Sequence, residues 1–93
     1  MAIVTEIGSL ISRRPEIRGG RPCIAGTGVS VRRIAALHNM GEMSEEIARN
    51  LGRLSLAQVH AALACYYANK AEIDADLEAA EREYDTLAQQ YRR

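Results

Sequence analysis

The side chains of this sequence best suited to metal binding or nucleophilic chemistry are Cys23, His38, His60 and Cys65. A zinc site built from such ligands needs pairs of them a few residues apart, and these four lack that spacing. A nucleophile needs an adjacent base and a third group that orients the base. No such set of Ser, Cys, His and Asp is recognisable, so we expect no metal site, no cofactor and no enzyme activity. We expect His38 and Cys65 to lie in or near the core.

A glycine-rich run at residues 18–31 could in principle cradle a phosphate group. It holds four of the seven glycines, and glycine allows tight turns and close backbone approach. A phosphate-binding P-loop needs a lysine after its last glycine, and this run has none. A dinucleotide loop needs a third glycine where this chain has Val31. We therefore interpret the run as a folded approach to the first helix.

Charge divides the chain into two parts whose charges cancel. Residues 1–69, which we call the head, hold eight Arg and five Glu, a net charge of +3. Residues 70–93, which we call the tail, hold four basic and seven acidic residues, a net charge of −3. This asymmetry suggests two partners of opposite charge. An unevenly charged surface without such partners is the alternative interpretation.

The spacing of apolar residues predicts short strands within residues 8–29, followed by three helices. The helices begin near Ser30, Ser44 and Ser55, and the first two end at Gly41 and Gly52. The third has the strongest local signal, because Gln58 follows Ser55 by three residues, as in a capping box.

The short turn at residues 52–54 resembles that of a helix-turn-helix, in which the following helix enters the major groove of DNA. Gln58 could then contact adenine. The helix itself has no Arg or Lys before Lys70, although phosphate contacts supply most of the affinity for DNA. A purely structural three-helix core therefore remains the alternative. The candidate DNA contacts are Arg13, Arg14, Arg18, Arg21, Arg32, Arg33, Arg53 and Gln58.

An apolar stripe with heptad spacing runs along the tail through Ile73, Leu77, Ala80, Tyr84, Leu87 and Tyr91. Residues 56–91 could form one helix, but we favour a break near Asn69 because helices of that length are rare in small domains. The stripe could fold onto the chain's own core, form a homodimer or lie in a groove of another protein. The candidate partner contacts are Ile73, Leu77, Tyr84, Leu87 and Tyr91.

Two segments resemble the family named domain of unknown function 433. The first runs from Arg14 to Thr27, with Val29-Ser30-Val31 after it, and the second covers residues 41–67. The resemblance implies a helix-turn-helix-like domain, often dimeric, regarded as an antitoxin of the VapB kind that accompanies a PIN-like ribonuclease toxin. The family usually has Arg after Gly-Thr, where this chain has Gly28.

We therefore expect a mainly α fold: a helix-turn-helix-like three-helix core with short N-terminal strands in residues 1–69, and a C-terminal amphipathic helix in residues 70–93. The expected function is that of a cytoplasmic, homodimeric type II antitoxin that inhibits a PIN-like ribonuclease toxin and could bind operator DNA. The alternative is a protein-interaction module whose helix-turn-helix does not bind DNA. No membrane segment is expected. Deletion of residues 70–93 is expected to abolish toxin binding.

Overall fold

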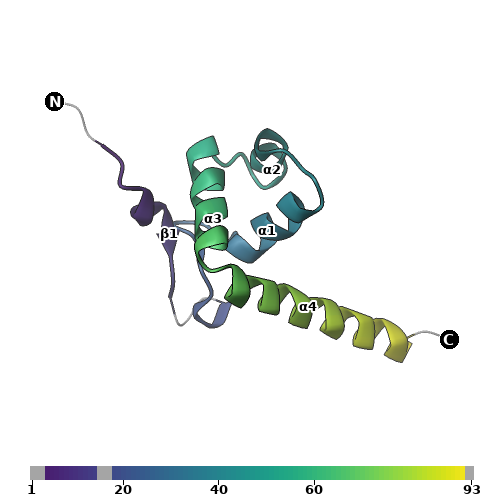
Figure 1. The fold of residues 1–93 in the computed structure, drawn as a ribbon. Helices are drawn as coiled ribbons and strands as arrows, with labels where there is room; N and C mark the ends of the chain where they lie inside the picture. Colours follow the sequence, from purple (N-terminus) through teal and green to yellow (C-terminus); the bar gives the residue numbers. More distant parts are fainter. Residues whose placement is uncertain (1–3, 15–17, 92–93) are drawn as a thin grey trace.

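The computed structural model describes residues 4–14 and 18–91, and most of them are helical (Figure 1). In chain order the elements are the 3-10 helix η1 (Ile7–Leu10), strand β1 (Ile11–Ser12), the 3-10 helix η2 (Arg18–Gly20), strand β2 (Cys23–Ile24), and helices α1 (Val31–Asn39), α2 (Ser44–Asn50), α3 (Leu56–Ala68) and α4 (Lys70–Tyr91). The mainly α fold with short N-terminal strands is confirmed.

The starts of α1 and α3 follow the capping signals of the sequence, whereas α2 has Met43 at its N-cap, whose amide donates to the Glu46 carboxylate at 3.0 Å. The Ser30 hydroxyl accepts a hydrogen bond from the Arg33 amide at 3.1 Å. Ser55 and Gln58 form the expected capping box: the Ser55 hydroxyl accepts from the Gln58 amide at 3.1 Å, and the Gln58 side-chain oxygen accepts from the Ser55 amide at 2.7 Å. These bonds satisfy amide groups that a helix start would otherwise leave unpaired.

The two strands form a small antiparallel sheet, with Ile11 opposite Ile24 and Ser12 opposite Cys23. Two strands this short are not stable alone, and both pack against α3. The glycine-rich run closes a tight loop after β2, in which the Ile24 amide donates to the Val29 carbonyl at 2.9 Å. Gly26 has a φ of 77° in this loop, a backbone conformation that favours glycine.

Helix α3 is the centre of the fold. Helices α1 and α2 pack against it, and so do η1, β1 and β2 (Figure 1). The core around it consists mainly of β-branched side chains, and its largest fully buried members are Ile24, Val31, Ile34, Ile47, Val59, Tyr66 and Ile73. The sequence has no Phe or Trp, and of its tyrosines only Tyr66 belongs to this core cluster.

The helical path breaks at Asn69, as expected. Its backbone leaves helical geometry (φ −129°, ψ 36°), and its side-chain amide donates to the Cys65 carbonyl at 3.0 Å. From this residue α4 leaves the helical body in a new direction (Figure 1). The break brings Ile73 into the core with an exposed fraction of 1%. The prediction that Ile73 contacts a partner is therefore wrong, because the chain's own helices already cover it.

A hydrogen-bonded joint fixes the direction of α4. The Tyr66 hydroxyl on α3 donates to the Asp74 carboxylate at 2.7 Å and accepts from the Asn39 side-chain amide at 3.2 Å. Lys70 donates to the other Asp74 oxygen at 2.7 Å. The hydrogen bonds from Lys70 and Tyr66 lower the pKa of Asp74, and the hydrogen bond to Asp74 raises the pKa of Lys70.

Beyond Ala80 the helix leaves the packed core, although Glu81 borders an open pocket with Asn39 and Met40, and Leu87 borders another with Arg21. Every side chain of residues 81–90, which we call the arm, is exposed. At 1.5 Å per residue the arm extends about 15 Å. The apolar stripe is thus buried at Ile73, half-buried at Leu77 and uncovered at Tyr84 and Leu87.

Two alanine substitutions test where the core ends along α4. Ile73→Ala should lower the free energy of unfolding by about 2–4 kcal/mol, because it leaves a cavity in a packed core. Leu87→Ala should change it by less than about 0.5 kcal/mol, because the arm is exposed. Urea denaturation followed by circular dichroism measures both. Equal losses would contradict the assignment of Ile73 to the core and of Leu87 to the solvent.

The joint predicts a pH dependence of stability. A lowered folded pKa means that the contribution of Asp74 is present above its ordinary pKa and is lost as the pH falls through the folded pKa. The raised pKa of Lys70 means that its contribution is present below the ordinary lysine pKa and is lost as the pH rises through the folded value. Asp74→Asn should therefore flatten the acid limb of the stability curve, as measured by urea denaturation between about pH 7 and pH 2.

Asp85→Asn is the matched control for that experiment, because Asp85 lies on the exposed arm. It should leave the acid limb unchanged. If the two variants give the same acid limb as the original chain, the Asp74 contacts do not stabilise the fold.

Candidate nucleic-acid and partner interfaces

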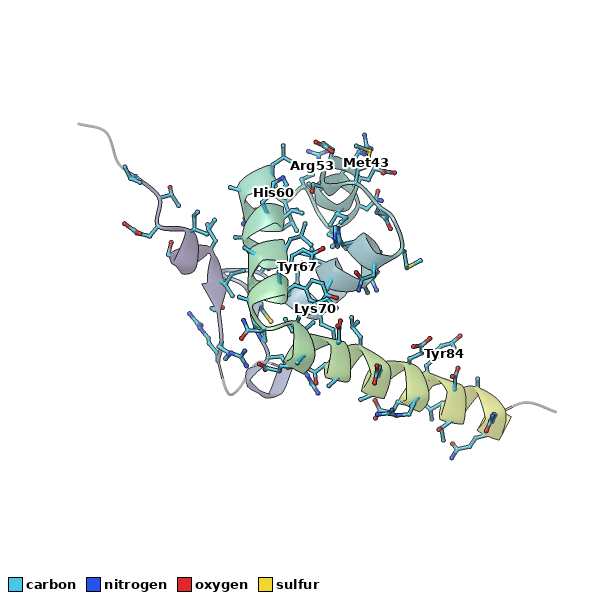
Figure 2. All side chains as sticks on the ribbon, viewed as in Figure 1. Met43, Arg53, His60, Tyr67, Lys70 and Tyr84 are labelled. Atoms are coloured by element: carbon cyan, nitrogen blue, oxygen red, sulfur yellow. The ribbon has the colours of Figure 1, made fainter. Side chains whose placement is uncertain are left out.

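Helices α2 and α3 are joined by a tight turn whose geometry suits a helix-turn-helix. Gly52 (φ 87°) and Arg53 (φ 62°) both adopt left-handed backbone conformations. The Leu54 amide donates to the Ala48 carbonyl at 3.0 Å and ties the turn back to α2. Arg53 is exposed in this turn (Figure 2). Arg49 on α2 is also exposed, although the sequence analysis did not select it.

The outward face of α3, which would enter the DNA groove if this were a DNA-reading helix-turn-helix, is uncharged at its Ala, Leu and Tyr positions and largely apolar. Its exposed residues are Leu56, Ala57, His60, Ala64, Tyr67 and Ala68. The Gln58 side-chain oxygen is occupied by the capping box, and the residue is half-buried. Basic contacts to phosphate would therefore have to come from residues outside α3.

Two of the candidate DNA contacts pair with acids of α4 instead. Arg13 makes two hydrogen bonds to the Glu72 carboxylate, at 3.0 and 3.3 Å. Arg21 donates to Asp76 at 3.1 Å. The hydrogen bond to Glu72 raises the pKa of Arg13. The sequence analysis missed Glu72 and Asp76 as contacts of the head, although the equal and opposite charges of head and tail were a signal for such pairing.

The remaining candidate arginines are spread over the head. Arg32 and Arg33 line an open pocket of about 470 Å³ whose apolar lining includes Val29, Ala36, Leu51 and Leu77. Arg14 lines a second pocket, of about 270 Å³, with Ser12, Cys23 and the loop at residues 26–28. Arg18 belongs to η2, and its side chain lies outside the described part of the structure. Arg32 and Arg33 thus line one pocket and Arg14 lines another, and neither pocket includes Arg53.

Gly28 borders both pockets. Its φ is not positive, in contrast to Gly26. A Cβ atom built at Gly28 has no neighbour within 4 Å. The backbone there does not require glycine, so a larger side chain at this position would fit.

His38 and the two cysteines pack among other side chains, whereas His60 is exposed. His38 lies 2.7 Å from the Tyr67 hydroxyl through its Nε2 atom, and the two rings meet edge to face. Both His38 and Cys65 are half-buried, which confirms their expected place near the core. Burial raises the pKa of the Cys65 thiol. Within residues 4–14 and 18–91, no cluster of three or more His, Cys, Asp or Glu side chains is placed to hold a metal ion.

The arm presents the most prominent uncovered apolar residues of the tail. Tyr84 is 72% exposed and Leu87 is 51% exposed, and Tyr84 projects from α4 with no other element beside it (Figure 2). The side chain of Tyr91 lies outside the described part. None of the described helices is both long enough and apolar enough to span a membrane.

Known proteins with a similar sequence or fold give a family but no activity. No curated protein matches the chain significantly. The crystal structure of a DUF433 member protein from Anabaena variabilis ATCC 29413 is similar to it, with a TM-score of 0.70 and 26% sequence identity, over 75% of this chain and 69% of that chain. The family model "Protein of unknown function (DUF433)" matches residues 11–67, which include β1, β2, α1, α2 and nearly all of α3. The chain therefore belongs to the DUF433 family.

Proposed function

We propose that this protein is an antitoxin of the VapB kind whose arm binds and inhibits a PIN-like ribonuclease toxin. The observation that carries this proposal is the arm itself: a helix end that projects from the body with Tyr84 and Leu87 uncovered. Exposed apolar side chains rimmed by polar ones mark interaction sites. Tyrosine is among the residues that contribute most to binding energy at interfaces.

The charge of α4 suits a nuclease as the partner. Between Lys70 and Tyr91 the helix carries seven acidic residues against two basic ones. A protein that binds RNA presents basic side chains to the phosphate backbone. An acidic helix can occupy that surface and exclude the substrate, so inhibition requires no reaction by the antitoxin.

Operator binding by the head is the weaker part of this proposal. The exposed arginines at the helix-turn-helix turn, Arg49 and Arg53, would supply its phosphate contacts. The neutral outward face of α3 and the pairing of Arg13 with Glu72 favour the alternative, a head that is an interaction module and does not read DNA. Homodimerisation and a cytoplasmic location stay predictions.

Removal of the arm should abolish toxin binding without unfolding the head. Deletion of residues 70–93 is a poor test, because it also removes Ile73 and Asp74 from the core and the joint. A chain that ends at Ala80 keeps both. Titrated against a PIN-like nuclease encoded in the adjacent reading frame, this chain should lose binding and inhibition of RNA cleavage while its circular dichroism remains helical.

A double substitution refines that test. Tyr84→Ala with Leu87→Ala should weaken nuclease binding at least about tenfold, because both are candidate anchors of the interface. Gln89→Ala, also on the exposed arm, is the control and should bind normally. Unchanged affinity of the chain that ends at Ala80 would refute the arm as the toxin-binding element.

DNA binding can be decided by fluorescence anisotropy on the DNA upstream of the gene. We expect no sequence-dependent binding by the protein alone or by its toxin complex, because α3 offers no basic side chain to the groove. The titration is repeated at several salt concentrations, since phosphate contacts make affinity depend on salt. Salt-sensitive, sequence-dependent binding that Arg49→Ala and Arg53→Ala weaken would establish the operator-binding function instead.

A further inference from the structure

We infer that the outer apolar stripe of α4, half-buried at Leu77 and uncovered at Tyr84 and Leu87, binds an apolar groove flanked by Lys and Arg on a different protein, and does not pair with α4 of a second copy. We call Leu77, Ala80, Tyr84 and Leu87 the seam. The inference deepens the proposed antitoxin function, on which it rests, by stating the chemistry of the surface that the arm recognises.

The heptad register of α4 places charges around the seam in an ordered way. With Leu77 and Tyr84 at position a, and Ala80 and Leu87 at position d, the seam is flanked by positions e and g. Position e holds Asp74 and Glu81, and position g holds Asp76 and Glu83. In the last heptad these positions are neutral, with Ala88 and Gln90. The only base of the arm, Arg82, is at position f, on the side away from the seam.

This arrangement opposes pairing between two copies of α4. In a parallel pair, position g of one helix faces position e of the next heptad on the other. Asp76 would then face Glu81 of the second copy. In an antiparallel pair, e faces e and g faces g, so carboxylates again meet carboxylates. Like charges in these positions disfavour association.

The inner half of α4 already shows what its flanking acids bind. Asp74 at position e pairs with Lys70, and Asp76 at position g pairs with Arg21 of the head at 3.1 Å. One heptad further, Glu81 and Glu83 continue the same two rows, and both side chains are exposed on the arm. Lys or Arg side chains on a partner would pair with Glu81 and Glu83 along the arm, as Arg21 pairs with Asp76 at the base of α4.

The apolar part of the partner surface has a defined length. From Leu77 to Leu87 the seam spans ten residues, or about 15 Å. Its most exposed member is Tyr84, so the groove needs its deepest pocket opposite Tyr84, about two-thirds of the way from Leu77 to Leu87 (Figure 2). The structure therefore assigns this seam to helix-in-groove recognition with a basic rim.

Two synthetic peptides test the inference without the nuclease. Each has three heptads with Leu at positions a and d; one has Lys at positions e and g, and the other has Glu there. The fluorescently labelled peptides are titrated with the full-length protein and followed by anisotropy. The Lys peptide should bind, more weakly as salt rises, and the Glu peptide should bind at least roughly tenfold more weakly.

Matched variants separate the position of the charges from their number. Glu81→Gln with Glu83→Gln removes two negative charges beside the seam. Ala75→Lys with Gln89→Lys changes the net charge by the same amount at position f, where both residues are exposed. The first variant should bind the Lys peptide roughly tenfold more weakly, and the second should bind as the original chain does.

Three results would overturn the inference: equal binding of the two peptides, equal weakening by the two charge variants, or no binding of the Lys peptide. Sedimentation of the full-length protein supplies a fourth. Self-association that Tyr84→Ser abolishes would show that a second copy occupies the seam. Because no nuclease is present, these outcomes are independent of the toxin-binding test, and either proposal can fail alone.

Discussion

The Tyr66 side chain holds the three longest helices of this fold together. Its ring is buried in the core, and its hydroxyl links Asn39 of α1 to Asp74 of α4. A buried hydroxyl must find hydrogen-bond partners, because an unsatisfied one is costly. Here both partners come from other helices, so this one side chain ties α1 and the first turns of α4 to α3, while the break at Asn69 sets where α4 begins. The arm extends beyond this joint and is exposed.

In the described part of the structure, three ion pairs join charged residues within the chain. At the base of α4, Glu72 and Asp76 pair with Arg13 and Arg21, and this neutralises part of the basic head that a nucleic acid would otherwise meet. Each such exposed pair contributes little to stability, at most about 1 kcal/mol. The larger effect of these two pairs is on recognition, because they neutralise two cationic side chains at the surface, whereas Glu81, Glu83 and Asp85 of the arm have no ion pair among the described residues.

Local signals in the sequence were sufficient for the helices, the caps and the break. Ser30, Ser55 and Gln58 cap helices through contacts at most three residues apart, and such contacts are legible in a single chain. The heptad stripe could also be predicted from the sequence, but the residue of α4 at which the core stops covering the stripe could not. Ile73 is buried and Tyr84 is exposed because of where α1 and α3 lie, which depends on contacts distant in sequence. The pairing of Arg13 with Glu72 spans 59 residues, beyond what pattern alone can specify.

The open position at Gly28 has a consequence for how this family can diverge. Since a Cβ atom there meets no neighbouring atom within 4 Å and the backbone is not left-handed, neither the backbone conformation nor close packing requires glycine at position 28. The residue at position 28 can therefore vary neutrally or be selected for the charge that it gives to the surface. The two pockets that meet there can gain or lose a cation while the scaffold, the joint and the arm stay the same.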